Sequence, residues 1–354
     1  MRQQELSSLN FKSLTLEFLI PSYKRPDSLI QAILSVASQI QGLGLSDRIT
    51  VVITDDASPN VTEVEIINTI SPFKDFIRFK KNTINKGMSL NIRDMVAASK
   101  ADFCTVLTDD DRLQPEALQE IVETLDHLND KIGSFFVPRY SYLEDQSLHC
   151  IVCNPSNKNV VIKSNPLNSL KYLHNGFILT GLFFKPKLIN FQLWNDNLEN
   201  SFFPLIYFAD LLLKYDCLFI NKNWFVHIVL NKCHWKSWGE NETIILARLY
   251  TDYISVVRVS TDIALSRVTR GIPTLYILRE EFFLYLKQMN STLSVINAVE
   301  LDESISSRFI YKIAMNIFKI NNTIFKPIKS CIKYYVKSVW KDFKMPKIKH
   351  NKVI

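Results

Sequence analysis

Short apolar runs alternate with amphipathic segments over the first third of the chain. Runs of apolar and often β-branched residues, each closed by polar residues, predict strands at residues 16–20, 49–54, 77–80 and 103–107. Apolar side chains at helical spacing predict helices at residues 28–39, 64–70, 89–99 and 116–128. Strict alternation of strand and helix predicts an α/β fold with a mostly parallel sheet flanked by helices.

Acidic residues follow two of the expected strands. Asp109, Asp110 and Asp111 end the strand at 103–107, and Asp55 and Asp56 end the strand at 49–54. Ligands of open α/β sheets bind at the carboxyl ends of the strands. Neighbouring carboxylates repel, and a divalent cation shared with phosphate oxygens would hold them together. The alternative for the triple cluster is an acidic turn that caps the next helix.

Composition is typical of a globular protein. The 354 residues are 47% hydrophobic and 22% charged, with only 8 glycines. Because no secretory signal and no run of about 18 apolar residues is visible, we expect a cytoplasmic location with six reduced cysteines. Cys150 and Cys153 form the only close pair, which has no partner pair at zinc-ribbon spacing and is interpreted as ordinary structural residues.

The net charge of +7 is concentrated near the end of the chain. Nine lysines and a single acidic residue, Asp342, lie between Lys326 and Lys352. Most of residues 243–343 is expected to be helical, and the tail predicts a basic amphipathic helix that lies on an anionic membrane surface. A helix packed on the domain, a calmodulin-like partner and RNA remain alternatives.

The sequence lacks the motifs of two other nucleotide-binding classes. No G-x-G-x-x-G follows the first strand and no Walker motif is present, which disfavours a dinucleotide oxidoreductase and a P-loop enzyme.

Four motifs in order resemble the inverting family 2 glycosyltransferases. These are PSYKRPDSL after the first strand, VVITDDAS, NKG before a helix, and TDDD before a proline-containing helix start. The resemblance implies a GT-A fold with a helical C-terminal extension, and the later part is similar to bacterial O-antigen deoxysugar transferases of the abequosyltransferase-like branch. The implied organisation is a lead-in, a nucleotide-sugar-binding half, an acceptor-binding half, a helical region and a basic tail, at residues 1–14, 15–128, 129–242, 243–325 and 326–354.

The same resemblance implies a donor site. Tyr23 would lie near the nucleobase, and Asp56, or else Asp55, would accept a hydrogen bond from it. Asp109 would meet the ribose and Asp110 would bind a divalent cation, Mg²⁺ or Mn²⁺. The other residues that the motifs imply for donor binding are Pro21, Ser22, Arg25, Asn85, Lys86 and Gly87. The other residues implied for metal binding are Asp111 and His234. Lys24 stands where the family often has Asn.

The general base is the least defined residue. The family places an Asp or Glu near the start of a helix in the second half, and Asp210, Glu199 and Asp196 are the candidates, with Asp210 first. Asp196 and Glu199 also fit a solvated loop or a helix cap. For the late histidine, His227 is the alternative to His234, and a structural role is the alternative for both.

The resemblance therefore implies a metal-dependent inverting transfer of a sugar from a nucleotide donor to a lipid-linked glycan in cell-surface polysaccharide assembly. The enzyme would lie on the cytoplasmic face of the inner membrane, and no nucleic-acid partner is expected. The alternatives are a catalytically inactive nucleotide- or sugar-binding scaffold and a nucleotidyltransferase, although the latter usually needs a Gly-rich basic loop near the first strand.

Overall fold

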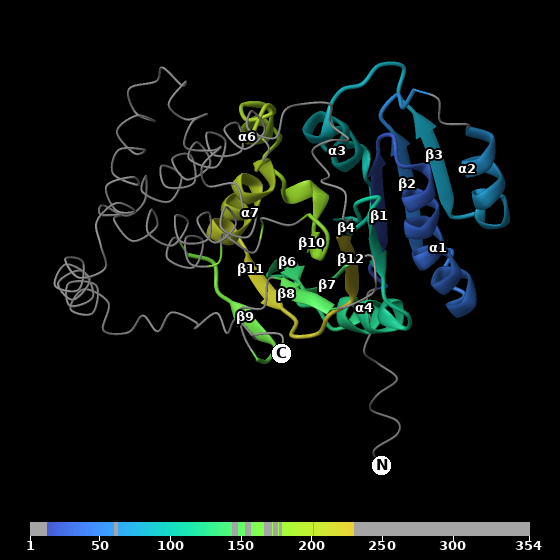
Figure 1. The fold of residues 1–354 in the computed structure, drawn as a ribbon. Coiled ribbons are helices and arrows are strands. Elements are labelled where there is room, and N and C mark those ends of the chain that lie inside the picture. The colour runs from blue at the N-terminus through green and yellow to red at the C-terminus, as the bar shows by residue number, and fades with distance from the viewer. Residues whose placement is uncertain are drawn as a thin grey trace, which may run out of the picture. The chain divides into compact units, whose positions relative to one another are not determined.

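The computed structural model of the chain covers its first two thirds in detail. It describes residues 13–59, 63–143, 148–152, 157–165, 172, 176, 179–200 and 202–229 (Figure 1). The helices expected within residues 243–343, the basic tail and His234 lie outside this part of the chain.

A large sheet of eight strands forms the centre of the described region (Figure 1). From one edge to the other the strands are β3 (Ile77–Lys81), β2 (Ile49–Asp55), β1 (Leu16–Ser22), β4 (Phe103–Val106), β10 (Leu182–Phe184), β6 (Ile132–Phe136), β11 (Asp216–Phe219) and β9 (Val160–Ile162). The first four are parallel to one another. Strand β10 is antiparallel to both β4 and β6, and β9 is antiparallel to β11.

Helices cover both faces of this sheet. One core contains apolar side chains of α1 (Pro26–Leu43), α2 (Glu63–Ile70) and α4 (Ala117–Asp126). The other contains those of α3 (Met88–Ala98), α6 (Phe191–Asn195) and α7 (Phe203–Lys214). Strand β1 contributes Phe18 to the first core and Leu19 to the second. Burial on both faces explains why β1 has a continuous apolar run rather than alternating residues.

A second sheet starts at the acidic cluster. Its order is β5 (Asp111–Leu113), β12 (Phe225–Val229), β7 (Arg139–Leu143) and β8 (Leu148–Val152). Strand β12 is antiparallel to β5 and parallel to β7. Asp111 therefore belongs to a strand that the sequence pattern did not predict.

The expected α/β architecture is confirmed, with small differences at element ends. The helix expected at 28–39 extends over Pro26–Leu43, because proline is accepted at its first position and Gly44 ends it with a left-handed φ of 64°. The helix expected at 116–128 begins at Ala117, since Glu116 has a left-handed φ of 65°. None of the helices in the described ranges is long and apolar enough to cross a bilayer.

Candidate active site

The carboxyl ends of β1 and β4 bring the first and the fourth sequence motifs together. Strand β1 ends at Ser22, whose hydroxyl donates a 2.9 Å hydrogen bond to Oδ2 of Asp109. The Tyr23 backbone N–H donates to the same oxygen at 3.4 Å. Because β1 and β4 are adjacent parallel strands, residues 87 and 86 positions apart meet at one edge of the sheet.

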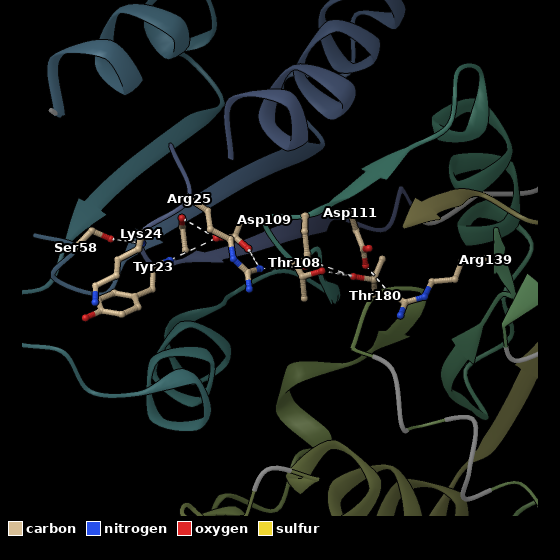
Figure 2. A network of polar contacts seen from close by, with 11 residues as sticks. Tyr23, Lys24, Arg25, Ser58, Thr108, Asp109, Asp111, Arg139 and Thr180 are labelled. Carbon is tan, nitrogen blue, oxygen red and sulfur yellow. Dashed lines mark hydrogen bonds and ion pairs between the residues drawn. The ribbon is translucent and has the colours of Figure 1, made fainter. Parts of the chain in front are cut away.

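Arg25 lies between two carboxylates of the acidic cluster. Its Nη1 is 3.1 Å from Oδ1 of Asp109 and 3.0 Å from Oδ2 of Asp110. Figure 2 shows the guanidinium of Arg25 next to Asp109. The side chains of Arg25, Asp109 and Asp110 are 21%, 8% and 14% exposed, so these charges interact in a largely desolvated setting.

Asp109 is the carboxylate whose ionisation the fold perturbs most clearly. Burial raises its pKa from 3.8 to about 6, and the neighbouring charge of Asp110 acts in the same direction. Arg25, the Ser22 hydroxyl and the Tyr23 amide lower the pKa but do not cancel the effect of burial. A carboxyl group with a strongly perturbed pKa at the ligand-binding edge of a sheet is a candidate functional group.

The second acidic pair fixes the loops beside the site. Asp56 accepts hydrogen bonds from Nδ2 of Asn82 at 2.8 Å, from the Lys86 N–H at 3.0 Å and from the Gly87 N–H at 2.8 Å. The loop at 82–87 is thereby attached to the end of β2. Gly87 begins α3 with a φ of 81°, a backbone conformation that favours glycine.

Asp55 holds the opposite side of the same strand end. It accepts the N–H of Ser58 at 3.1 Å and the Ser58 hydroxyl at 2.5 Å. The Ser58 hydroxyl in turn accepts the Lys24 N–H at 2.7 Å, which connects the turn after β1 to the turn after β2 (Figure 2). Asp55 and Asp56 therefore both organise backbone in this structure.

Lys24 has a structural role that sequence reasoning missed. Its φ is 60°, in the left-handed region that Asn tolerates better than Lys. The Lys24 ammonium lies over the ring of Tyr23, 4.8 Å from the ring centroid. Tyr23 and Pro21 are half-buried.

Asp111 is separated from its two neighbours in the cluster. Its side chain is fully buried and lies 2.6 Å from Nη1 of Arg139 on β7. Figure 2 shows the Asp111–Arg139 pair apart from the Arg25–Asp109 pair. The pair thus links β5 to β7, two strands of the second sheet that both pair with β12, which is compatible with the supporting role implied for Asp111.

Two residues missed by the sequence analysis complete this region. Arg139 pairs with Asp111, and the Thr180 hydroxyl accepts the Thr108 N–H at 3.2 Å (Figure 2). Arg139 and Thr180 both lie in residues 129–242, the half expected to bind the acceptor, and neither belongs to a sequence motif. The sequence signal that could have pointed to Thr180 is the glycine after it, since Gly181 adopts a φ of 94°, a conformation that favours glycine.

The donor set at Arg25 suits a hard divalent cation. Two carboxylate oxygens already converge on one cationic nitrogen, and Mg²⁺ is bound through one or two carboxylates plus phosphate oxygens. Among the residues that the structure describes, no group of three His, Cys, Asp or Glu side chains is placed to hold a metal. A cation here would therefore take its other ligands from substrate and water.

The base candidates occupy three different settings. Asp210 lies on α7, is 5% exposed and pairs with Nζ of Lys214 at 2.7 Å. Asp196 is exposed and directly follows α6, where it accepts a hydrogen bond from the Gln192 side chain, while Glu199 is exposed in the loop after it. Within the described ranges, no hydrogen bond joins any of the three to Asp109 or Asp110. The backbone of His227 pairs with that of Asp111 across β12 and β5.

Comparison with known proteins identifies the class. The sequence model described as glycosyl transferase family 2 matches residues 17–188, which include the carboxyl ends of β1, β2 and β4. No curated protein matches the chain.

Two crystal structures of S. aureus TarS resemble the fold. The complex with UDP-GlcNAc has 12% sequence identity and a TM-score of 0.55, over 81% of this chain and 80% of that chain. The complex with UDP has 12% identity and a TM-score of 0.52, over 83% of this chain and 77% of that chain. With the fold and the acidic strand ends in agreement, the described region has the GT-A fold, and residues 17–188 match the glycosyl transferase family 2.

Proposed function

We propose that this protein transfers a sugar from a nucleoside-diphosphate-sugar to a lipid-linked glycan by a single inverting displacement that depends on a divalent cation. The observation that carries the proposal is the convergence of Asp109 and Asp110 on one cationic nitrogen at the carboxyl edge of the sheet. The TarS structures of similar fold contain UDP or UDP-GlcNAc, which supports a nucleotide-sugar as the donor class.

In this proposal the residues of the first half bind the donor. Tyr23 stacks beside the nucleobase, and the loop of Asn85, Lys86 and Gly87, held by Asp56, lines the nucleotide. Asp109 meets the ribose hydroxyls. The carboxylate of Asp56 already accepts hydrogen bonds from three N–H groups. A nucleobase N–H would therefore donate to an Asp56 oxygen that also accepts a bond from the protein.

Asp110 would hold the divalent cation, with His234 as a further candidate outside the described residues. When bound, Mg²⁺ or Mn²⁺ supplies positive charge next to the departing diphosphate. Asp111 and Arg139 keep the strand that follows Asp110 in place and so position its carboxylate.

Asp210 is the proposed general base, with Asp196 and Glu199 as the alternatives. A base must accept the proton of the attacking acceptor hydroxyl. Asp210 is buried on α7, and its carboxylate lies 2.7 Å from Nζ of Lys214. Asp196 and Glu199 are exposed, as expected for loop carboxylates.

We also propose that the lysine-rich tail at 326–352 holds the enzyme on the anionic cytoplasmic face of the inner membrane. The support for this is its sequence pattern alone. A membrane position would bring the enzyme to a lipid-linked acceptor. Vesicle sedimentation of the full chain with and without anionic lipid, compared with a chain in which six of these lysines are replaced by Gln, tests this part.

The donor site is tested by nucleotide binding. UDP, GDP, CDP and dTDP are titrated by calorimetry with and without Mn²⁺, on wild type and on Asp110→Asn. We expect one diphosphate to bind in a Mn²⁺-dependent manner and the variant to lose that dependence. If no diphosphate binds to the folded wild type, the proposed function is wrong.

The general base is tested by turnover of the donor identified in this way. Asp210→Asn is expected to lower the rate of diphosphate release by about 100-fold or more with unchanged donor affinity. The matched variants Asp196→Asn and Glu199→Gln are expected to keep the rate within a few-fold. A full rate in Asp210→Asn would remove this residue from the mechanism, and absence of turnover in wild type with intact donor binding would favour a scaffold protein.

A further inference from the structure

Arg25 occupies the position at which the proposed donor site needs two free carboxylates. Its Nη1 contacts Oδ1 of Asp109 and Oδ2 of Asp110 at the same time. The other oxygen of Asp109 is held inside the protein by the Ser22 hydroxyl and the Tyr23 amide. On Asp109, the oxygen that Arg25 holds is therefore the one left for a ligand.

A divalent cation and Arg25 would compete for these carboxylates. A divalent ion bound to Asp110 would lie within a few ångströms of the Arg25 guanidinium, and like charges at that distance repel strongly where solvent is largely excluded. All three side chains are at least about four fifths buried, since Arg25 is 21% exposed and the carboxylates are less exposed still. Binding of the ion therefore weakens the Asp110–Arg25 contact, and the contact weakens binding of the ion.

The backbone of Arg25 is fixed, so an exchange involves the side chain alone. Arg25 precedes α1, and its carbonyl accepts the Leu29 N–H at 3.0 Å. The side chain has no other hydrogen-bond partner among the described residues than these two carboxylates. An arginine released from a carboxylate next to a diphosphate finds a new anionic partner, because the guanidinium matches phosphate geometry.

We propose that Arg25 is an internal counter-ion that competes with the divalent cation and yields Asp109 and Asp110 only when a diphosphate arrives to accept its charge. Arg25 thereby makes cation binding depend on the nucleotide. The inference rests on the proposed function, because it assumes that Asp110 is the cation ligand and Asp109 the ribose ligand. It adds an order of binding: the site binds the cation weakly when nucleotide is absent and tightly when nucleotide is present.

The test is calorimetric titration of Mn²⁺ alone into the folded chain without nucleotide. Arg25→Gln removes the charge and is expected to bind Mn²⁺ at least tenfold more tightly than wild type. Arg25→Lys keeps the charge and is expected to bind Mn²⁺ as weakly as wild type. Arg78→Gln is the matched control, since Arg78 is exposed on β3 and its loss changes the net charge equally.

A second readout measures the coupling between the two ligands. In wild type the UDP affinity, or that of whichever diphosphate binds, is expected to rise at least tenfold with Mn²⁺ present. In Arg25→Gln this enhancement is expected to shrink, because the cation no longer needs the diphosphate to displace Arg25. Thermal unfolding of each variant without ligand confirms that it is folded before titration.

The outcomes separate the inference from the proposed function. If Arg25→Gln binds Mn²⁺ no more tightly than wild type, while wild type shows Mn²⁺-dependent nucleotide binding that Asp110→Asn abolishes, the inference is wrong and the proposed function stands. Equal Mn²⁺ binding by Arg25→Lys and Arg25→Gln would also overturn it, since charge would not matter. If wild type shows no Mn²⁺-dependent nucleotide binding, both are wrong.

Discussion

Removing the charge of Asp109 is expected to stabilise the ligand-free protein at neutral pH while it abolishes donor binding. The change is Asp109→Asn, which keeps the size of the side chain and an oxygen that can accept from Ser22 or Tyr23. Burial of the carboxylate is the largest influence on its pKa, so the folded protein favours the protonated form. At neutral pH the wild type must ionise this group in an unfavourable environment.

The magnitude follows from the pKa. A rise from 3.8 to about 6 spans about two pKa units, and each unit corresponds to about 1.4 kcal/mol, which gives an upper limit of about 3 kcal/mol. Because the folded pKa lies above the unfolded one, the folded state holds the proton more tightly between these values. The contribution is therefore present below pH 4, is lost as the pH rises through about 6, and stays lost at neutral pH.

The assay is urea unfolding of wild type and Asp109→Asn without metal at a series of pH values from 4 to 8. The free energy of unfolding of the variant minus that of wild type is expected to grow with pH by up to about 3 kcal/mol and to level off above pH 6 to 7. Asp75→Asn, the same change at an exposed carboxylate, is the control. A difference for Asp109→Asn that does not change with pH would refute the reasoning.

Three further changes test single features. Glu116→Asn is expected to raise the free energy of unfolding by about 0.5–1 kcal/mol in urea, because Asn tolerates the left-handed φ of 65°; a decrease would contradict this. Arg139→Met leaves buried Asp111 without this counter-ion and should cost about 3 kcal/mol or more; a double-mutant cycle with Asp111→Asn should recover part of the loss, and a neutral Arg139→Met would refute the role of the pair. Gly87→Ala at a φ of 81° should cost about 1–3 kcal/mol and weaken nucleotide binding in calorimetry, whereas an unchanged affinity would show that the loop does not contact the nucleotide.

The sequence predicted the elements whose signal is local. Strands β1, β2, β3 and β4 and helices α1 to α4 could be predicted because each has its own apolar period and its own polar ends. Strands of the second half, such as β10 with three residues, are too short to show a period. Their place between β4 and β6 is fixed by packing partners distant in sequence, which no local pattern encodes.

The site was predicted in the same uneven way. Three consecutive aspartates look equivalent in sequence, yet Asp111 lies in a strand and pairs with Arg139, 28 residues later, while Asp110 meets Arg25. The sequence analysis placed Asp109 and Asp110 at the edge of a sheet, as the structure has them, but could not assign each a partner. Thr180 was missed because its contact with Thr108 spans 72 residues.

The pairing of β1 with β4 has a consequence for the newly made chain. Leu16 lies opposite Phe103, so one edge of β1 has no partner until the ribosome has released about 90 further residues. Until then the unit of β1, β2 and β3 exposes an open strand edge, a known route to aggregation. The contacts of Ser22, Tyr23 and Arg25 with Asp109 span 84 to 87 residues, so the catalytic edge forms only after that gap closes. A slow stretch of translation just after β4 would let this edge be covered before the second half of the domain emerges.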